Sequence, residues 1–331
     1  LMNIAGLSIY WVASHLISSG SLEIGQLVAF MDYLFHAMFS IMLFCTVFMM
    51  YPRAEVSAKR IEEVFKLEPL IKNKPIESDS DEQVSIEFDH VTFVYPDGEE
   101  PVLQDISFKV SKGQMIAFIG STGSGKSTLV NLIPRFYDVS SGSIKINGKD
   151  IRDYDILELR DKLGVIPQKA VLFSGSIADN IRFGKKDASD EEVEYAAKVA
   201  QAYPFIMKKE HGFDEEISEG ATNVSGGQKQ RLSIARALVR KAQIYIFDDS
   251  FSALDFKTDA VLRKELKKEM KDSIMMVVAQ RISSIMEADQ IVVLNDGKVV
   301  GHGTHLQLLK ECQIYHEIAT SQLSEEELAY E

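Results

Sequence analysis

This sequence contains few cysteines and has no excess of positive charge. Its two cysteines, Cys45 and Cys312, lie far apart and match no disulfide or metal-binding spacing, so a reduced intracellular setting is expected. Lys and Arg together number 36 against 49 Asp and Glu, which gives a formal net charge of −13. This balance argues against nucleic acid, or a polybasic patch on a membrane surface, as the main partner. No cleavable leader is visible after Leu1, and we expect the chain to be the C-terminal part of a longer one.

Charge is also almost absent from the start of the chain, where two apolar runs stand instead. The run 27–50 contains only Asp32 and His36 as polar interruptions of any weight, and as a helix it would extend about 36 Å. That length is sufficient to cross a bilayer with some tilt. A shorter run, 1–17, precedes it, and the polar segment 18–26 separates the two. The sequence therefore predicts a membrane hairpin of two helices, with a buried hairpin in a soluble protein as the alternative.

The charges that follow the second run predict its orientation. Arg53, Lys59 and Arg60 cluster within about ten residues of its end, which by the positive-inside rule places that end in the cytoplasm. Asp32 and His36 are one helical turn apart and could face either a polar pathway or the headgroup region. We therefore predict a multi-pass protein of the cell membrane whose following domain is cytoplasmic.

A change of pattern after residue 50 predicts where the domains divide. Residues 54–66 continue as an amphipathic helix, so 1–66 are assigned to the membrane part. Residues 67–83 carry prolines and a run of acidic side chains, which is typical of a linker. From there onward short strands and turns predominate, and 84–331 are predicted to form one α/β domain.

The strongest motif of the second domain is a phosphate-binding loop. A buried-type strand over 115–119 runs into Gly120-Ser-Thr-Gly-Ser-Gly-Lys-Ser127, which fits the pattern G-x-x-x-x-G-K-[ST] with a strand before it and a helix after it. Gly123 and Gly125 let main-chain amides wrap a phosphate, and Lys126 reaches the β- and γ-phosphates. The hydroxyl that closes the motif is placed to hold Mg²⁺. This loop therefore predicts a nucleoside triphosphate and Mg²⁺ as ligands.

Two further stretches complete the expected nucleotide machinery. Residues 243–247 form an apolar strand that ends at Asp248, whose carboxylate would orient Mg²⁺ through its water shell. Between loop and strand lies Val224-Ser-Gly-Gly-Gln228, directly ahead of an amphipathic helix. Main-chain N–H groups of Ser225 and the two glycines, at the positive end of that helix, are suited to a phosphate. One chain therefore carries two phosphate-binding devices.

With these motifs in this order, the chain resembles an ATP-binding cassette (ABC) exporter in which membrane and nucleotide-binding parts share one chain, over essentially all 331 residues. The resemblance implies an α/β P-loop ABC ATPase domain preceded by the last transmembrane helices of an all-α membrane domain. We expect a mixed sheet around the phosphate loop, a helical insertion over 167–236 and a small antiparallel part before Tyr95. The resemblance also implies that two such domains pack head to tail, so that each ATP lies between one subunit's phosphate loop and the other's signature, Val224–Gln228.

The resemblance also assigns roles to single residues. Tyr95 matches the aromatic side chain that stacks on adenine, Gln168 matches the glutamine that touches Mg²⁺ and senses the membrane domain, and Asp255 belongs to the D-loop. The implied ATP-binding set is Tyr95, Gly120, Ser121, Thr122, Gly123, Ser124, Gly125, Lys126, Ser127, Thr128 and Gln168. The implied Mg²⁺ set is Ser127, Gln168 and Asp248. The signature residues implied to act in trans on a partner's ATP are Ser225, Gly226, Gly227 and Gln228.

Two positions depart from the family's pattern, and both bear on hydrolysis. Asp249 stands where a glutamate usually acts as base or positions the attacking water, and its side chain is one methylene shorter, which withdraws the carboxylate by about 1.5 Å. Gln280 stands where a switch histidine is expected, and an amide can hydrogen-bond a γ-phosphate but cannot carry the positive charge or relay a proton. Together the two changes predict that hydrolysis at this site is impaired. The alternative is that Asp249 still acts as a slow base.

An impaired site beside an intact signature predicts one subunit of a heterodimeric exporter, whose partner carries the catalytic glutamate and the switch histidine. The two alternatives are a homodimer with slow hydrolysis and a largely regulatory nucleotide-binding subunit. The apolar hairpin and the single nucleotide domain disfavour a soluble ABC ATPase of DNA repair or translation. A GTPase is disfavoured because no Asn-Lys-x-Asp motif occurs. The expected partners are a second subunit, the lipid bilayer and a substrate that the sequence does not identify, and no nucleic acid is expected.

Overall fold

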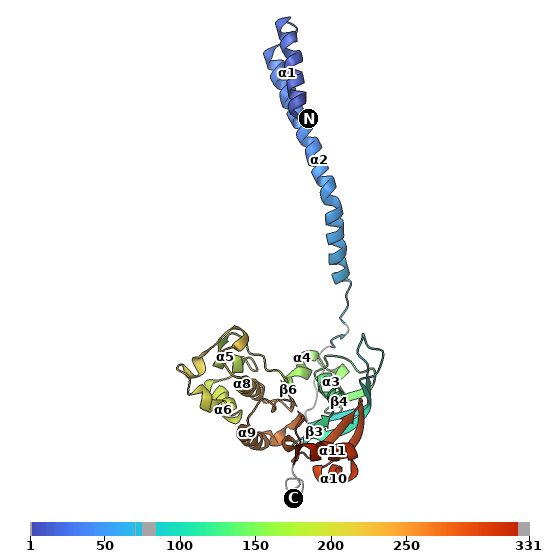
Figure 1. Ribbon diagram of the computed structural model, residues 1–331, viewed down its shortest axis with the longest axis vertical. Coiled ribbons are helices and arrows are strands. Elements are labelled where there is room, and N and C mark those ends of the chain that lie inside the picture. Colours follow the sequence, from blue (N-terminus) through green and yellow to red (C-terminus); the bar gives the residue numbers. More distant parts are fainter. Residues whose placement is uncertain (1, 70, 75–83, 324–331) are drawn as a thin grey trace. The chain divides into compact units, whose positions relative to one another are not determined.

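The chain divides into two compact units, Leu1–Leu70 and Ile71–Glu331. A computed structural model describes residues 2–69, 71–74 and 84–323. Figure 1 shows that the first unit is helical and that the second combines helices and strands. The boundary between the units falls inside the predicted linker 67–83, of which residues 70 and 75–83 lie outside the described part.

The first unit is a pair of helices. Helix α1 (Met2–Ser18) is followed by a short turn and by helix α2 (Ile24–Phe65), whose first turn is capped by reciprocal hydrogen bonds between Glu23 and Gln26. The two helices lie side by side over the first part of α2 (Figure 1). Their contact is close, because a Cβ at Gly6 would lie 3.6 Å from the Cε atom of Met31.

Helix α2 joins the predicted segments 27–50 and 54–66 into one helix. It runs for 42 residues with Pro52 inside it, and none of its residues is buried. Among the described residues, α2 is the one helix that is long and apolar enough to cross a membrane. With 17 residues, α1 lies at the lower limit of length for a span. The predicted span over 1–17 therefore stays a prediction.

In its described residues, the second unit contains two large sheets and one small pair of strands. The larger sheet has the order β12-β11-β3-β10-β9-β6, and β12 alone runs antiparallel to its neighbour. Its strands are β3 (Met115–Gly120), β6 (Leu163–Ile166), β9 (Ile244–Asp248), β10 (Ile274–Val278), β11 (Gln290–Asn295) and β12 (Lys298–Gly303). The other sheet, β2-β1-β4-β5, is antiparallel and consists of β1 (Ser85–Phe93), β2 (Leu103–Ser111), β4 (Ser141–Ile146) and β5 (Lys149–Asp150). Strands β7 (Gly175–Ser176) and β8 (Glu216–Ile217) pair with each other.

This arrangement confirms the predicted α/β fold with a mixed sheet and corrects one detail. The antiparallel part does not lie only before Tyr95, because β1 pairs on one side with β2 and on the other with β4, both of which follow it in sequence. The prediction treated the strand before Tyr95 by itself. Its partners are separated from it by turns and by the phosphate loop, so no local pattern connects them.

Helices flank the larger sheet and form the predicted insertion. Helix α3 (Lys126–Leu132) follows β3, and α4 (Ile156–Asp161) precedes β6. The insertion comprises α5 (Ile177–Arg182), α6 (Asp190–Val199), α7 (Tyr203–Ile206) and α8 (Gly226–Leu238), and the remaining helices are α9 (Phe256–Glu269), α10 (His305–Glu311) and α11 (Gln313–Gln322). The apolar face that periodicity gives to α8 is buried, namely Leu232, Ala235, Leu238 and the following Val239.

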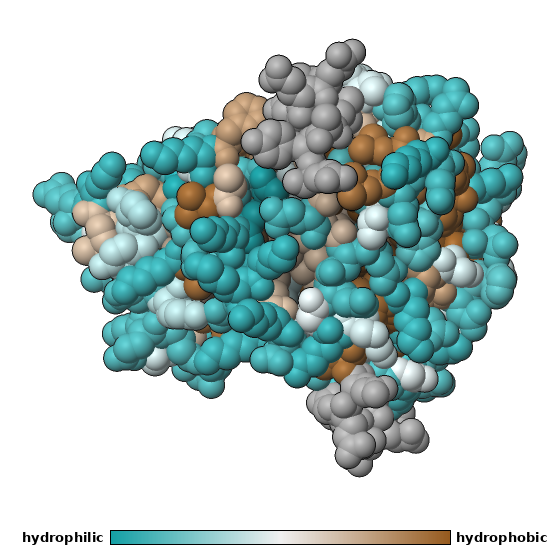
Figure 2. All heavy atoms as spheres, turned by 90° about the horizontal axis from the view of Figure 1, so that it is seen from below, coloured by the Kyte–Doolittle hydropathy of each residue, from teal (hydrophilic) through white to brown (hydrophobic). Residues whose placement is uncertain are grey.

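Strand β3 lies between two hydrophobic cores. Ile116 and Phe118 belong to the core shared with the antiparallel sheet, whereas Ala117 and Ile119 belong to the core under the helical insertion. This alternation follows from the period of two along a strand, and burial on both faces explains the uninterrupted apolar run. The outer face of the unit seen in Figure 2 is mainly hydrophilic. The phosphate loop therefore starts from a strand that both cores hold in place.

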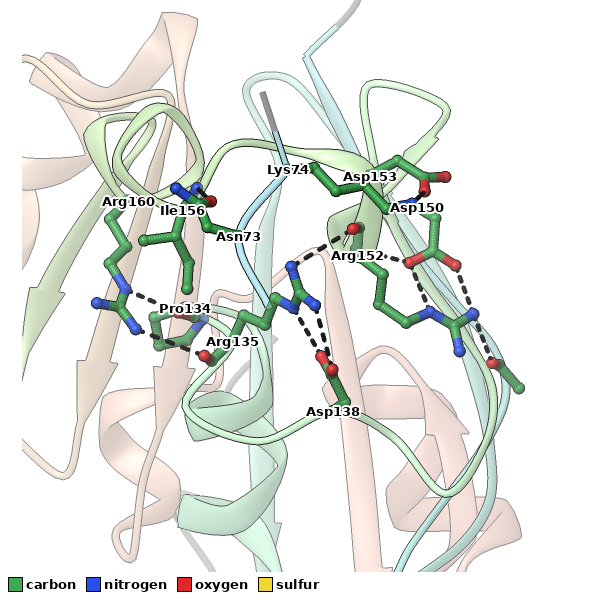
Figure 3. A network of polar contacts seen from close by, with 11 residues as sticks. Asn73, Lys74, Pro134, Arg135, Asp138, Asp150, Arg152, Asp153, Ile156 and Arg160 are labelled. Atoms are coloured by element: carbon green, nitrogen blue, oxygen red, sulfur yellow. Dashed lines mark hydrogen bonds and ion pairs between the residues drawn. The ribbon is translucent and has the colours of Figure 1, made fainter. Parts of the chain in front are cut away.

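A polar network fixes the chain at the start of the second unit (Figure 3). Asn73 Nδ2 donates a hydrogen bond to Asp155 Oδ2 at 2.8 Å, and Asn73 Oδ1 accepts one from the main-chain N–H of Ile156 at 2.8 Å. Asp155 is itself the N-cap of α4, so Asn73 satisfies one further N–H of that first turn. Lys74 forms an ion pair with Asp153. Residues 71–74 of the predicted linker therefore belong to the second unit.

Candidate functional site

The loop between β3 and α3 has a backbone that its glycines permit. Gly123 has a φ of +84°, in the left-handed region that glycine adopts readily, and a Cβ there would meet no atom within 4 Å. At Gly120, by contrast, a Cβ would come within 1.9 Å of the carbonyl oxygen of Leu294 on β11. Gly120 therefore allows the loop to lie close against the sheet. Gly123 leaves open space in which a ligand can approach main-chain N–H groups.

Lys126 is held inside the curve of this loop. Its Nζ atom donates to the carbonyl oxygens of Gly120 at 2.9 Å and Ser121 at 2.7 Å, and to Ser124 Oγ at 3.2 Å. Its side chain is buried, and burial lowers its pKa, while two nearby carboxylates act in the opposite direction. A cation that neutral oxygens hold in this way can exchange them for phosphate oxygens, which form stronger, charge-assisted hydrogen bonds.

Asp248 and Ser127 meet at the mouth of the loop. Ser127 Oγ donates to Asp248 Oδ1 at 3.0 Å. Burial raises the pKa of Asp248, and the neighbouring carboxylate adds to that effect. A hydroxyl beside one carboxylate suits Mg²⁺, which keeps several waters and takes its remaining oxygens from phosphates. Within the described part of the chain no cluster of three or more His, Cys, Asp or Glu could hold a metal by itself.

Asp249 receives two amide hydrogen bonds on one oxygen. Gln168 Nε2 donates to Asp249 Oδ2 at 3.1 Å, and Gln280 Nε2 donates to the same oxygen at 2.7 Å. Asp249 is buried, with a positive φ of 47°, a conformation that aspartate tolerates better than most residues. Burial raises its pKa, against the hydrogen bond from Gln168. The carboxylate is therefore poorly solvated and held between two neutral donors.

The order of the strands explains why these two glutamines meet at one carboxylate. Strand β9, which ends at Asp248, lies between β10 and β6 and runs parallel to both. Gln280 follows β10 and Gln168 follows β6, so both side chains leave the same edge of the sheet as Asp249. Nothing in the local sequence around either glutamine indicates this arrangement.

Most of the predicted ATP and Mg²⁺ residues line one cleft of about 250 Å³. Its lining is Val102, Gly120, Thr122, Gly123, Gly125, Lys126, Ser127, Thr128, Gln168, Asp248, Asp249, Val278 and Gln280. Val102 and Val278 were not predicted, because an apolar residue beside a strand carries no chemical signal of its own. A larger hollow of about 410 Å³ includes Met115, at the opposite end of β3, and contains none of the motif residues.

Tyr95 lies beside the phosphate-loop helix. Its hydroxyl is 3.0 Å from Thr128 Oγ1, and its ring packs edge-on against Phe93 and Tyr137 at 4.8 and 5.2 Å between centroids. Tyr137 is a further aromatic side chain near the loop that sequence reasoning missed. The stacking of adenine on Tyr95 stays a prediction.

The signature forms the exposed beginning of α8. Ser225 Oγ accepts from the N–H of Gln228 at 3.3 Å, and Gln228 Oε1 accepts from the N–H of Ser225 at 3.0 Å, which is a capping box. Both residues therefore have a structural role in starting the helix. Gly226 has no such role, because a Cβ there would meet no atom within 4 Å and its backbone is not left-handed. Open space at a helix N-terminus is where an anion from outside the chain can approach.

The signature and the D-loop contact each other but do not line the cleft. A Cβ at Gly227 would lie 3.2 Å from the carbonyl oxygen of Ala253, which belongs to the D-loop over 252–255. Asp255 caps α9 by accepting from the N–H of Thr258 at 3.0 Å. Neither the signature nor Asp255 is among the cleft residues. The structure thus brings together the phosphate loop, Asp248, Asp249 and the two glutamines, and keeps the second phosphate-binding device apart.

These features define an α/β protein with a P-loop nucleotide-binding domain, and comparison with known proteins gives its family. Residues 103–252 match the family described as ABC transporter. The chain belongs to the ABC transporter family.

Relatives align along nearly the whole chain. An uncharacterized ABC transporter ATP-binding protein of Mycobacterium tuberculosis is 40% identical over 97% of this chain and 56% of its own length. The uncharacterized ABC transporter ATP-binding protein YfiB of Bacillus subtilis is 42% identical over 98% of this chain and 56% of its own. The structure of a bacterial Atm1-family ABC exporter with ATP bound aligns with a TM-score of 0.87 and 32% identity, over 98% of this chain and 57% of that one. The chain therefore spans little more than half the length of these relatives.

Proposed function

We propose that this chain is the ATP-binding and permease part of an ABC exporter, which couples ATP binding and hydrolysis to export of a substrate across a membrane. The observation that carries the proposal is the single cleft in which the phosphate loop meets Asp248, Asp249, Gln168 and Gln280. The likeness to an ATP-bound exporter supports the direction of transport. Helix α2, with the length and composition of a membrane span, supports the permease part.

ATP and Mg²⁺ are the proposed ligands of this cleft. Main-chain N–H groups of the loop and the Lys126 ammonium would hold the β- and γ-phosphates, with Tyr95 against the adenine. Ser127 and Asp248 would hold Mg²⁺, with Gln168 beside them. The ion, when bound, neutralises the charge on the phosphates. Phosphate oxygens can replace the main-chain carbonyl oxygens that now hold Lys126, and Ser127 and Asp248 already lie in hydrogen-bond contact at the proposed Mg²⁺ position.

Hydrolysis in this chain's own site is proposed to be slow. The Asp249 side chain is shorter than the usual glutamate, and two amide hydrogen bonds on Oδ2 hold its carboxylate in place, so its reach toward an attacking water is reduced. Gln280 is an amide and carries no proton between water and phosphate. A displacement on the order of 1 Å at such a base costs about a hundredfold in rate. Slow hydrolysis with Asp249 as base fits the same geometry.

The signature is proposed to act on the ATP of a second subunit. The open space at Gly226, and the absence of the signature residues from the lining of this chain's cleft, support this assignment. An impaired site combined with an intact signature favours a heterodimer whose partner supplies the glutamate and the histidine. A homodimer that hydrolyses ATP slowly at Asp249 is the second candidate.

The membrane part is proposed to cross the bilayer twice within residues 1–50, with the nucleotide-binding domain over 84–331 in the cytoplasm. Most of the large apolar side chains of α1 and α2 are exposed, and a bilayer is a solvent that would cover them. Arg53, Lys59 and Arg60 follow the second span and agree with a cytoplasmic end.

The double substitution Asp249→Glu with Gln280→His tests the assignment of the impaired site. In the purified full-length protein we expect this double substitution to raise the ATP turnover number at least about tenfold. The glutamate restores the reach of the carboxylate, and the histidine supplies a titratable group. The matched control is Asp161→Glu with Gln313→His, the same two exchanges at exposed positions outside the cleft. Normal transporter turnover by the unmodified chain alone would refute the impaired site, and failure to bind ATP would refute the function itself.

A further inference from the structure

The last helix of the described chain contacts the loop that carries Gln280. Gln322, at the end of α11, accepts a hydrogen bond on Oε1 from the main-chain N–H of Ile282 at 2.8 Å. Its Nε2 donates to the main-chain carbonyl oxygen of Gln280 at 2.8 Å. One side-chain amide therefore pairs with two main-chain groups on either side of Arg281, as a peptide group does in a sheet.

Packing holds the helix that presents this amide. Tyr315 and Ala319 of α11 are fully buried in the core that also contains Ile282 and Ile285. The Tyr315 hydroxyl is 2.7 Å from Nδ1 of His305, a second buried contact that fixes the helix. Gln322 follows Ala319 by about one turn, so its amide projects from a fixed support.

The same loop directs the Gln280 side chain toward the cleft. Its Nε2 donates to Asp249 Oδ2 at 2.7 Å, so a single residue is held at its main chain by Gln322 and at its side chain by Asp249. In the same loop the Arg281 guanidinium lies 5.2 Å from the centroid of the Phe256 ring. The loop thus has a second contact, and Gln322 supplies the directional hydrogen bonds.

We propose that Gln322 is a positioning residue for this chain's ATP site, acting through Gln280. This inference rests on the proposed function of the cleft. Gln322 holds the main chain at Gln280 so that the Gln280 amide meets Asp249 and, with ATP bound, stands beside the γ-phosphate. The end of α11 therefore sets the geometry of hydrolysis without touching the nucleotide.

The chemistry requires an amide at position 322. The N–H of Ile282 needs an acceptor and the carbonyl of Gln280 needs a donor, and a neutral amide is the side-chain group that offers both at this spacing. Methionine has a similar length and offers neither in comparable strength. Gln322→Met therefore removes the two hydrogen bonds and keeps most of the volume.

The test follows nucleotide bound to this chain in the full-length protein, alone or with its partner, in lipid nanodiscs. The probe is 8-azido-[α-³²P]ATP with Mg²⁺, cross-linked by a flash of light at successive times, after which this chain is isolated and its label is scored as ATP or ADP. Gln322→Met is expected to change the rate at which bound ATP is hydrolysed or released by about threefold to tenfold, the effect of losing one or two neutral hydrogen bonds. Labelling by 8-azido-ADP is expected to stay the same, because ADP has no γ-phosphate.

A double-mutant cycle separates positioning from a general loss of stability. On a Gln280→Ala background, Gln322→Met is expected to have no further effect, because the side chain through which it acts is gone. Gln313→Met, on the exposed side of the same helix, is the matched control and is expected to behave as wild type. An equal effect of Gln322→Met on both backgrounds, reduced labelling by 8-azido-ADP, or no effect at all would each overturn the inference. Absence of any labelling of the wild type would instead reject the proposed function, and this inference with it.

Discussion

Gln280 Nε2 donates to Asp249 Oδ2 at 2.7 Å, which joins the two positions from which the sequence predicts impaired hydrolysis. A neutral amide facing a carboxylate is a complementary pair that needs no charge on the donor. The shorter acid and the uncharged switch residue therefore form one local unit, in which each satisfies the other. Changing Asp249 to glutamate alone would still leave an uncharged donor opposite the carboxylate, so the proposed test changes both positions.

Asp249→Asn is expected to stabilise the protein at neutral pH. Burial raises the pKa of Asp249, so the folded state holds that proton more tightly than the unfolded chain does. The contribution of Asp249 to the free energy of unfolding is therefore largest below the ordinary Asp pKa of about 3.9 and is lost as pH rises through the raised value. Asparagine cannot ionise, and its oxygen can still accept from both glutamines. We expect a higher Tm than wild type at pH 7 and a difference that vanishes near pH 3.5.

Asp255→Asn is the control, because it is expected to change the Tm in the opposite direction. Its main-chain and side-chain hydrogen bonds with Thr258 lower the pKa of Asp255, so its carboxylate contributes stability above the ordinary Asp pKa that is lost as pH falls through the lowered value. This variant is expected to have a lower Tm than wild type at pH 7. A Tm that moves in the same direction for both variants would contradict the explanation by pKa.

Asn73→Ala is expected to raise the pKa of Asp155 toward its ordinary range. The Asn73 side chain is the largest cause of the lowered pKa of that carboxyl, followed by the main-chain N–H of Glu158. Carbon-13 shifts of labelled Asp carboxyls, followed against pH, measure the change. Lys74→Ala is the crossed control, since it is expected to raise the pKa of Asp153 and leave Asp155 unchanged. A shift of both carboxyls in either variant would indicate that the segment leaves its position as a whole.

Phe39→Arg is expected to weaken membrane insertion of α2. Phe39 lies near the middle of the predicted span 27–50, and an arginine at the centre of a spanning helix costs about 2.5–3.5 kcal/mol on insertion scales. Alkaline extraction of membranes that contain the full-length protein measures the fraction retained. Val64→Arg is the control, because Val64 is exposed on the same helix but outside the predicted span. Equal retention of the two variants would argue that 27–50 does not cross the bilayer.

Sequence reasoning was most successful where function depends on neighbours in the chain. The strand over 115–119, the loop after it and the helix that follows form one continuous motif, so spacing alone predicted their order. Asp248 and Ser127 come together because β3, β10 and β9 are adjacent parallel strands, whose ends share one edge of the sheet. That adjacency is a property of the fold, which the family resemblance supplied.

Several of the contacts that sequence reasoning missed are made by side-chain amides between distant segments. Asn73 meets Asp155 across 82 residues, and Gln322 meets the loop at Gln280 across 42. An amide side chain carries no charge, and its position in the sequence follows no periodic pattern. Nothing in the sequence therefore distinguishes it from an exposed surface residue. Its role arises only when tertiary packing places a donor and an acceptor at the right separation, which is why the structure was needed to find it.

Gly226→Ala is expected to leave folding intact and to impair the site of a second subunit. A Cβ at Gly226 would meet no atom of this chain within 4 Å, and at the start of α8 alanine is favoured over glycine by up to about 1 kcal/mol, so the Tm should not fall. The methyl group would nevertheless occupy the space through which a phosphate reaches the helix N-terminus, and we expect at least a tenfold loss of ATP turnover in the assembled transporter, on the order of other small displacements in active sites. Gly25→Ala is the matched control, because it is also a glycine in the first turn of a helix with open space around it. Unchanged turnover in Gly226→Ala, or an equal loss in Gly25→Ala, would show that the signature of this chain does not act on a partner's nucleotide.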